Sequence, residues 1–595
     1  MTMKQNYLNG KDFFNIFRHG AMEVINNKDH LNKINVFPVA DGDTGNNLAM
    51  TLNSVIDYTQ VVDSFYETSK SMAEASIYGA RGNSGVIFAQ YISGIASGSE
   101  GKDRISLKDF IEVTRKASEG IYESLVHPVE GTMLTVMKQW SLYLSEHKDK
   151  YQNVEEMFLN SIDEAKSLLA KTPEQLEVLR KHNVVDSGAK GFVYYLEGII
   201  KFIRGETIEV SGDFQGAGVL AQGYDRNHEN TEFRYCTETL IKGRVDKDEL
   251  KEALGAYGDS IIVAGSATLK HVHLHTNKVE AVFKLLSKYG VIDRPKIEDM
   301  RVQEKLKDKT SKIAVLTDSI GDFPKSYLDQ YDVHLLPVNI FVGENQYLDK
   351  MTVDPEDFYE TIKHSEVYPN SGQPNDIQVK HKIDFLKEHY ESIICIMVSS
   401  KLSGTYESVE KYGKKLKEEG YPIEVIDSKL NSGGQGLLVT RVAEMVAAGA
   451  SKEEVLEAID TIIPETEIYV ALNTFANSLK SGRVPKVVGK IGVFFKLRPI
   501  ISLDKEGKGT AFSIALSKKM LMNKIKNMLE KKNKEKPITE YAVVYSKDEQ
   551  GAEAFAKELQ KIIGKPPKYI TEVSSVTALH VGEGAVAVGF IREGA

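Results

Sequence analysis

The chain has 595 residues, with 75 lysines and arginines against 84 aspartates and glutamates, and a formal net charge of -9. At about 150 residues per domain, this length predicts about four domains and excludes a single compact core. The acidic excess argues against a nucleic acid partner, because covering phosphates needs clustered positive charge. Two cysteines cannot form a disulfide framework. Since the first residues are polar and no apolar run could span a bilayer, we expect a cytoplasmic protein.

The first half of the chain contains two kinds of apolar pattern. Apolar residues recur at three- and four-residue steps over residues 9–204, which predicts a mostly helical domain. Residues 212–232 are rich in Gly, Asn, Asp and Gln, as is typical of a connector. Strand-like and helix-like segments then alternate, which predicts a small α/β unit. We therefore place the first two domains at residues 1–205 and 230–303, and a third at 312–595.

The third domain begins with apolar runs that each end in Ser or Asp and precede a helix-like segment: IAVLTDS, IICIMVSS and IEVIDS. This pattern predicts parallel strands with crossover helices. Ligands bind beyond the carboxyl ends of such strands, so the polar residues that close the runs are candidate site residues. Beyond Glu467, further strand-like runs indicate a second α+β lobe, so that this domain has two lobes.

An acidic loop, NVFPVADGDTGNN, precedes a helical segment that begins near Leu48. Asp41 and Asp43 are carboxylates of the kind that Mg²⁺ uses when it bridges substrate phosphates. A calcium hand is excluded, because its twelfth loop position needs Glu and is here Leu52. A helix-capping Asx turn explains the same residues equally well on spacing alone.

A glycine-rich stretch, YGARGNSGV at residues 78–86, enters a predicted helix. Free backbone amides at such a helix start favour a phosphate, although small residues also permit close helix packing. The acidic loop would hold a metal and the glycine loop would hold phosphates, which together predict a nucleotide site. Two further loops, at residues 127–135 and 185–191, offer small polar residues that could complete it.

Four motifs occur in order within the first 200 residues: NVFPVADGDTGNNL, ARGNSGVI, HPVEGTMLTV and VDSGAKG. They resemble the nucleotide-binding domain of dihydroxyacetone kinases and, more closely, the kinase subunit of bacterial fatty acid kinase. The resemblance implies an all-α helical barrel that binds ATP through two Mg²⁺ ions held by Asp41 and Asp43. It also implies these nucleotide-binding residues: Gly82, Asn83, Ser84, Gly85, Thr132 and Met133. Dihydroxyacetone kinases have a third Asp where this chain offers Asn35.

His271, His273 and His275 alternate along a predicted strand, so their side chains lie on one face. With Cys236 in the same small unit, they could form a Zn²⁺ site of imidazole and thiolate. The alternative is a polar strand face with solvated histidines. The stretch HVHLHTN resembles a segment in the middle domain of the fatty acid kinase subunit, which implies a structural or regulatory zinc bound by Cys236, His273 and His275.

The polar ends of the C-terminal runs carry many hydroxyl groups with one Arg and one His. No G-x-S-x-G elbow of a hydrolase surrounds Ser403, and the set suits an anion such as a carboxylate. TDS, LSGTY, DS, SGR and the terminal H-x-G-x-G resemble the DegV family of fatty-acid-binding proteins. The resemblance implies a bound fatty acid and these binding residues: Ser371, Ser403, Gly404, Thr405, Arg483 and His580. The family pattern T-S-Q-P is altered by Gly372, and a relic that binds no lipid is the alternative.

Together, these resemblances imply a fatty acid kinase that transfers the γ-phosphate of ATP to an acyl carboxylate. Asp41 and Asp43 would act through the metals, and Arg483 and His580 would steady the migrating charge. Expected partners are a homodimer mate, an acyltransferase that accepts the product, and transiently a membrane for lipid exchange. A kinase of another small substrate, such as a hydroxyketone, and a non-catalytic lipid carrier or sensor are the alternatives.

Overall fold

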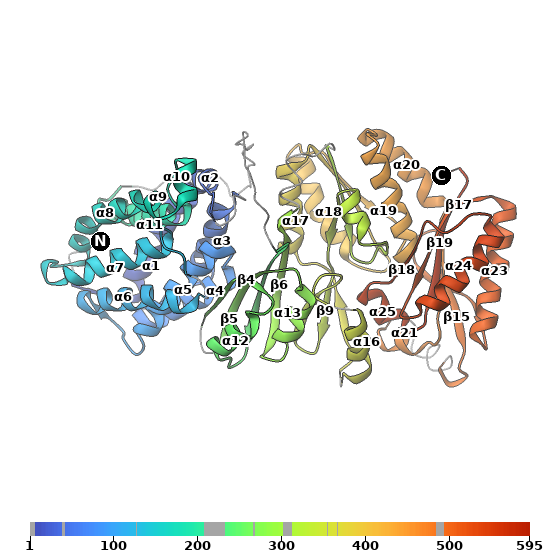
Figure 1. Cartoon of the computed structure of the whole chain (residues 1–595), viewed down its shortest axis with the longest axis horizontal. Coiled ribbons are helices and arrows are strands. Elements are labelled where there is room, and N and C mark those ends of the chain that lie inside the picture. The colour runs from blue at the N-terminus through green and yellow to red at the C-terminus, as the bar shows by residue number, and fades with distance from the viewer. Residues whose placement is uncertain are drawn as a thin grey trace. The chain divides into compact units, whose positions relative to one another are not determined.

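The computed structural model describes residues 6–37, 42–125, 128–206, 233–265, 268–301, 312–353, 355–365, 367–482 and 493–594. The chain divides into two compact units, Met1–Gln303 and Glu304–Ala595, which are described separately below (Figure 1). Two predicted site residues, Asp41 and Arg483, lie outside the described residues. No helix in the described part of the chain is both long and apolar enough to cross a bilayer.

The N-terminal part of the first unit is helical, as predicted. Its helices are α1 (Gly10–Asn26), α2 (Lys28–Lys33), α3 (Thr44–Tyr58), α4 (Phe65–Gly79), α5 (Gly82–Gly98), α6 (Leu107–Ser124), α7 (Met133–Glu146), α8 (Val154–Ala170), α9 (Thr172–Gln175), α10 (Glu177–His182) and α11 (Ser187–Ile203). Two short strands, β1 (Tyr7–Leu8) and β2 (Ile105–Ser106), pair antiparallel. Apolar faces of the longer helices share one core, which includes Phe17, Phe88 and Phe192.

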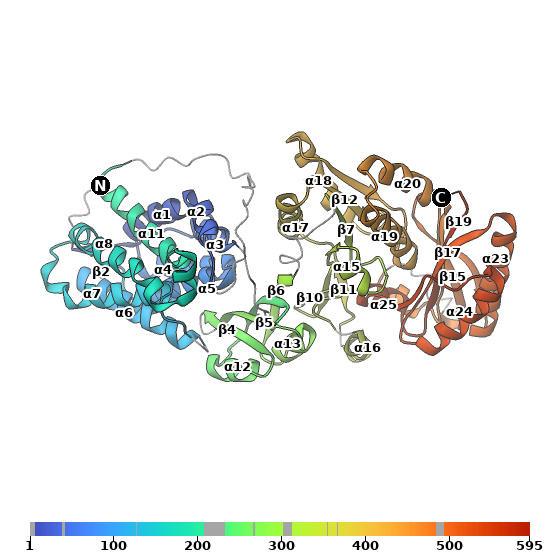
Figure 2. The same ribbon diagram turned by 45° about the horizontal axis from the view of Figure 1, so that its top comes forward.

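A four-stranded antiparallel sheet with two helices completes the first unit (Figure 2). Its elements are β3 (Tyr235–Lys242), α12 (Lys247–Leu254), β4 (Gly258–Gly265), β5 (Leu269–Thr276), α13 (Val279–Leu286) and β6 (Val291–Asp299), with strand order β4-β5-β3-β6. Ile262 and Ala264 of β4 pack with Ala80, Val86 and Ala89 at the start of α5. Because strand pairing sets Ile262 opposite His273 and Ala264 opposite His271, the histidine face of the sheet is the one turned toward α5.

The second unit begins with an all-parallel sheet of order β13-β12-β7-β8, as the apolar runs predict. Its strands are β7 (Ile313–Asp318), β8 (Val333–Leu336), β12 (Ser392–Met397) and β13 (Ile423–Asp427). The helices of this region are α15 (Ser326–Gln330), α16 (Pro355–His364), α17 (Asp376–His389) and α18 (Thr405–Glu418). A small antiparallel sheet of order β10-β9-β11 contains β9 (Asn339–Val342), β10 (Asn345–Leu348) and β11 (Asn370–Gly372).

The rest of the second unit contains a six-stranded sheet of order β16-β15-β14-β19-β17-β18. Its strands are β14 (Thr466–Ala471), β15 (Arg498–Leu503), β16 (Gly509–Ala515), β17 (Ile538–Tyr545), β18 (Tyr569–Glu572) and β19 (Val586–Arg592), and its helices are α19 (Ser432–Ala447), α20 (Lys452–Glu465), α21 (Ala476–Lys480), α23 (Lys518–Glu535), α24 (Glu549–Ile563) and α25 (Ser575–Val581). Buried residues of α19 pack in one core with residues of both large sheets. This core joins the two sheets into one α/β unit.

Candidate functional site

The start of α5, which carries the glycine loop, lies beside the first turns of α3, which follow the acidic loop. A Cβ atom on Gly82 would lie 2.3 Å from the side-chain amide of Asn47, and one on Gly85 would lie 2.3 Å from the hydroxyl of Thr51. The backbone amide of Arg81 also donates to the Thr51 hydroxyl at 3.3 Å. Glycine is therefore required in this loop to admit the first turns of α3.

The two further loops join the same region. A Cβ atom on Gly188 would lie 3.2 Å from both the Ser84 hydroxyl and the Met133 side chain. Asp186 caps α11 by accepting a hydrogen bond from the Ala189 amide at 2.7 Å. Burial raises the pKa of Asp186 to about 6, although backbone amides of Ala189 and Met133 counteract this rise. The structure thus brings the predicted residues Ser84 and Met133 together, and adds Asp186, whose role sequence reasoning missed.

Asp43, the predicted metal ligand within the described residues, precedes α3. It occupies the N-cap position, yet its side chain makes no capping hydrogen bond. The capping alternative therefore does not explain this carboxylate. Its half-buried side chain is close enough to Cys236 to act on that thiol electrostatically. The carboxylate thus remains suited to Mg²⁺, with Asp41 two residues earlier in the sequence.

The histidine face of the middle sheet holds the predicted zinc ligands. Ligand atoms of Cys236, His273 and His275 all lie within 4.8 Å of one another. The side chain of His273 is only 2% exposed, and its Nε2 atom has no hydrogen-bond partner among the described residues. The alternative of solvated histidines is therefore wrong for His273, and also for buried His271, whose pKa burial lowers to about 4. A thiolate and two imidazoles fit Zn²⁺ with a fourth position open.

Glu238 lies at the centre of this face, and sequence reasoning missed it. One carboxylate oxygen, Oε1, accepts a hydrogen bond of 2.7 Å from the backbone amide of Gly82 and lies 3.1 Å from His273 Nδ1. The other oxygen lies 3.9 Å from the ammonium of Lys296. Burial alone would raise the pKa of Glu238, but Lys296 and His273 lower it well below its usual value. The middle sheet thus supplies a buried carboxylate to the glycine loop.

In the second unit, predicted carboxylate-binding residues meet near β11. The Ser371 hydroxyl lies 3.5 Å from His580 Nε2, and the hydroxyls of Ser403 and Thr405 lie 2.9 Å apart. A Cβ atom on Gly404 would lie 1.9 Å from Gln373 Oε1, so β11 and the 403–405 loop are in contact. Gln373 is a further residue at this site, because its amide donates to Ser408 at 2.9 Å. These groups form a hydroxyl-rich cluster without a carboxylate among the residues named.

The alteration at Gly372 has a local explanation. A Cβ atom there would lie 2.9 Å from the ring of Phe341 on the neighbouring strand. A hydroxyl residue at this position would therefore require a shift of the Phe341 ring, whereas glycine leaves room for it.

Hydrogen bonds from two elements fix the helix α25, which carries His580. The Ser478 hydroxyl donates to the His580 carbonyl at 2.8 Å, and the Tyr368 hydroxyl donates to the Leu579 carbonyl at 2.7 Å. Asn477 in turn donates to the Tyr368 hydroxyl at 3.0 Å. Hydrogen bonds from α21 and from the segment before β11 therefore fix the start of the H-x-G-x-G motif at the end of α25.

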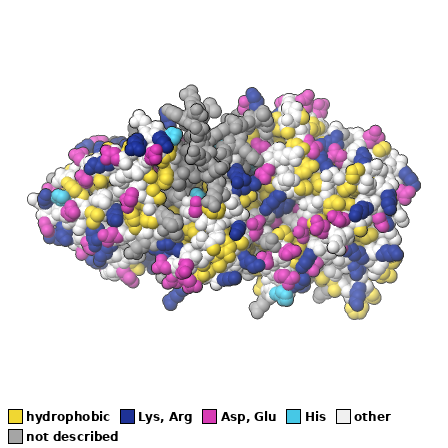
Figure 3. Space-filling model, viewed as in Figure 1, with side chains coloured by type: hydrophobic (Ala, Val, Ile, Leu, Met, Phe, Trp, Pro, Cys, Tyr) yellow, Lys and Arg dark blue, Asp and Glu magenta, His cyan; other side chains and the backbone are white. Residues whose placement is uncertain are grey.

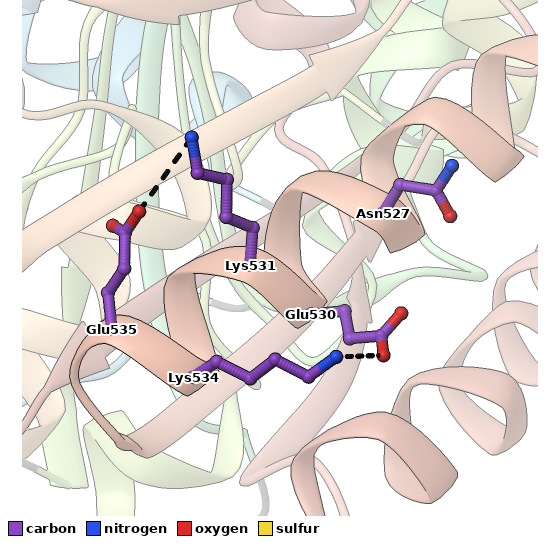
Figure 4. Close-up of a pocket in the computed structure, with 5 residues that line it drawn as sticks. All are labelled: Asn527, Glu530, Lys531, Lys534 and Glu535. Atoms are coloured by element: carbon purple, nitrogen blue, oxygen red, sulfur yellow. Dashed lines mark hydrogen bonds and ion pairs between the residues drawn. The ribbon is translucent and has the colours of Figure 1, made fainter.

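A surface pocket on α23 is lined by Asn527 and four charged residues of the same helix (Figure 4). Lys534 pairs with Glu530 at 2.7 Å, and Lys531 lies 3.8 Å from Glu535. Acidic and basic side chains also intersperse over the face of the molecule drawn in Figure 3. Since these charges neutralise one another in solvent, the α23 pocket has the character of an ordinary helix surface.

Three family models match the chain in succession. Residues 38–201 match the DAK2 domain, and residues 232–307 match the middle domain of FakA-like fatty acid kinase proteins. Residues 312–593 match the DegV family of uncharacterised proteins. The order of these three matches resembles the architecture of a fatty acid kinase. A DAK2 kinase-type domain, its middle domain and a DegV domain are thus joined in one polypeptide.

Curated relatives and solved structures resemble parts of the chain. An uncharacterized protein of Staphylococcus epidermidis is 32% identical over 348 residues, which is 53% of this chain and 62% of that protein. The chain thus spans less than two thirds of the length of this relative. A DegV fatty acid binding protein from Bacillus subtilis is 24% identical, with 48% of this chain and 100% of that chain covered and a TM-score of 0.43. The fatty acid kinase B3 protein of Streptococcus pneumoniae, loaded with linoleic acid, is 19% identical, with 47% and 99% covered and a TM-score of 0.43.

Proposed function

We propose that this chain is a fatty acid kinase that transfers the γ-phosphate of ATP to the carboxylate of a fatty acid carried by its own DegV domain. The observation that supports this most directly is the succession of the DAK2, middle and DegV domains in one polypeptide. Relatives of the DegV domain bear names that describe them as fatty acid binding proteins. In this chain, donor and acceptor would therefore be held by the same molecule.

On the nucleotide side, the backbone amides of residues 82–85 at the start of α5 bind phosphate oxygens, favoured by the helix dipole. Thr132 and Met133, at the start of α7, lie beside the nucleotide. Asp43 and Asp41 would hold Mg²⁺, and the ion would offset repulsion between the phosphates and the attacking carboxylate.

On the acyl side, Ser371, Ser403 and His580 bind the fatty acid carboxylate, and the family resemblance adds Arg483 as a basic residue of the same site. Hydroxyl groups suit this task because they donate hydrogen bonds to a carboxylate without the desolvation cost of burying a second charge. Gln373, in contact with Gly404, keeps the two serine-bearing segments together.

The reaction forms one P–O bond and breaks another. A carboxylate oxygen attacks the γ-phosphorus in line, the bond to the β,γ-bridging oxygen breaks, and that oxygen leaves as part of ADP. The acyl carboxylate is already ionised at neutral pH, so no general base is needed. The product is an acyl phosphate, a reactive anhydride that an acyltransferase could consume for phospholipid synthesis.

The middle sheet binds one Zn²⁺ through Cys236, His273 and His275. Their atoms are close enough to converge on one ion, and the buried Nε2 atom of His273 would otherwise lack a partner among the described residues. The ion would supply a fixed positive charge beside the nucleotide loops.

The decisive experiment traps the product. The purified chain is incubated with ATP, Mg²⁺ and fatty acids of several chain lengths in the presence of hydroxylamine, which converts an acyl phosphate to a hydroxamate. We expect hydroxamate that depends on both ATP and fatty acid. Failure to form it with any chain length, while ATP is consumed with a hydroxyketone, would favour a kinase of another small substrate. Failure with no ATP consumption at all would favour a lipid carrier or sensor.

A further inference from the structure

Glu238 makes a contact that neither the domain arrangement nor the proposed zinc site requires. Its Oε1 atom accepts a hydrogen bond from the first backbone amide of α5, that of Gly82, at 2.7 Å. The two residues are 156 positions apart in the chain, and the carboxylate side chain is only 2% exposed. A buried anion therefore already lies at the start of the helix to which phosphate binding is assigned.

The surroundings of this carboxylate favour an anion. The Lys296 ammonium lies 3.9 Å from Oε2, and Arg81, the residue before Gly82, acts electrostatically on Lys296. The positive end of the α5 dipole adds to this potential. Oε2 has no hydrogen-bond partner among the described residues. Together these groups form an anion site whose present occupant is a side chain of the middle sheet.

A phosphate oxygen and Glu238 cannot both use the Gly82 amide. That amide has one hydrogen, and the two oxygens would carry like charges within hydrogen-bonding distance of the same atom. A nucleotide phosphate that binds there must displace the carboxylate, and with it shift the strand β3 or the side-chain rotamer of Glu238.

We propose that Glu238 is an anionic gate: it occupies the phosphate position at Gly82 when no nucleotide is bound, and ATP must displace it. The gate rests on the proposed function, since it assumes that phosphates bind at the glycine loop. It makes nucleotide binding and the position of the middle sheet reciprocally coupled. Because only molecules with an open gate can bind nucleotide, the apparent affinity is the intrinsic affinity multiplied by the fraction of molecules in which the gate is open.

The first test measures nucleotide binding by titration calorimetry with ATP and Mg²⁺ on the full chain, which requires no turnover. Glu238→Gln keeps the shape of the side chain but removes its charge. We expect ATP to bind about 5- to 20-fold more tightly to this variant.

Glu298→Gln is the matched control. Glu298 pairs with the same Lys296 at 3.0 Å, so its substitution removes one negative charge from the same ammonium without touching the Gly82 amide. If the gate operates through the Gly82 amide, Glu298→Gln should change ATP affinity by less than about twofold. Equal tightening in both variants would overturn the gate, because the effect would then be general electrostatics.

A second measurement tests the contact itself. Hydrogen exchange of the peptide that spans residues 79–86 is followed by mass spectrometry in the absence of nucleotide. Glu238→Ala should speed exchange in this peptide, and addition of ATP should restore its protection. Unchanged exchange in Glu238→Ala would overturn the gate.

The outcomes also separate the gate from the proposed function. If the unaltered chain binds ATP but Glu238→Gln binds it equally or more weakly, the gate is wrong and nucleotide binding stands. If neither binds ATP, the proposed function fails and the gate fails with it. A thermal melting curve of each variant identifies loss of folding. If a variant does not fold, hydrogen exchange on the unaltered chain decides. ATP should then displace Glu238 without lowering the protection of residues 79–86, and loss of that protection would overturn the gate.

Discussion

The two candidate sites of this chain contain different kinds of polar side chain. The site in the first unit concentrates ionisable groups, among them buried Glu238 and His273 and half-buried Lys296, where a helix start meets the face of an antiparallel sheet. The site in the second unit gathers neutral hydroxyl and amide groups, such as Ser371 and Ser403, beside a small sheet. Both draw on residues far apart in the chain.

This difference follows from what each site is proposed to bind. Metal ions and phosphates carry high charge, so their site needs charged ligands whose burial cost the bound group offsets. A single carboxylate at the end of an apolar chain needs only hydrogen-bond donors. Substitution of a charged residue in the first-unit site should therefore have a large effect on turnover or binding, and substitution of one hydroxyl residue in the second-unit site should have a modest effect.

The largest effect should come from the acidic loop. Asp43→Asn removes a metal ligand without a change of size, so we expect turnover to fall about 100- to 1,000-fold. The hydroxamate assay measures turnover, and mass spectrometry measures fatty acid that co-purifies, which should be unchanged. Full turnover in this variant would show that Asp43 holds no catalytic metal.

The cluster on the middle sheet should lose its metal when one ligand is removed. In Cys236→Ser, zinc content measured by elemental analysis should fall from about one ion per chain to near zero, and the thermal midpoint should fall with it. Cys395→Ser is a matched control, since Cys395 is fully buried in β12 of the other unit. Equal zinc in both variants would contradict the site.

Two buried carboxyls, one in each unit, should give the two units a similar dependence of stability on pH. Burial raises the pKa of Asp186 from 3.8 to about 6, so the folded chain binds more protons than the unfolded chain between these values. Stability from this group is complete below pH 3.8 and declines by about 3 kcal/mol as pH rises to 6. Asp186→Asn should remove this decline. The thermal midpoint of the variant should therefore fall less between pH 5 and pH 7 than the midpoint of the unaltered chain.

Asp349 in the second unit provides the matching test, because burial raises its pKa to about 6 as well. Asp349→Asn should change the midpoint in the same direction. A midpoint that falls at pH 7 in both variants would contradict the sign of these shifts.

The smallest effect should come from the hydroxyl cluster. Ser403→Ala removes one hydrogen-bond donor from a set of several, so fatty acid binding should weaken by about 1 kcal/mol, or roughly 5-fold. Displacement of a fluorescent fatty acid measures this loss. Thr361→Ala is a control, because the half-buried Thr361 hydroxyl donates to the Asp357 carbonyl of its own helix, α16. A loss of fatty acid affinity of more than about 100-fold would show that the Ser403 hydroxyl alone dominates binding, contrary to the expectation that several donors share it.

Much of this arrangement could be predicted from sequence because its signals are local. Alternation along residues 271–275 predicted a strand with three histidines on one face, and apolar runs that end in Ser or Asp predicted the parallel sheet. Glu238 could have been found by the same alternation, since it lies two residues after Cys236 on β3. Gln373 and Asp186 belong to motifs that were recognised, but their contacts depend on loops that are distant in sequence.

The sequence by itself determined the order of the motifs, the face on which each side chain lies and the chemical character of the two sites. Only the tertiary structure decided which faces meet. Ile262 and Ala264 pack on Val86 and Ala89. This apolar packing places Glu238 within hydrogen-bonding distance of the Gly82 amide. Such a meeting depends on the summed burial of residues more than a hundred positions apart, which no local pattern encodes.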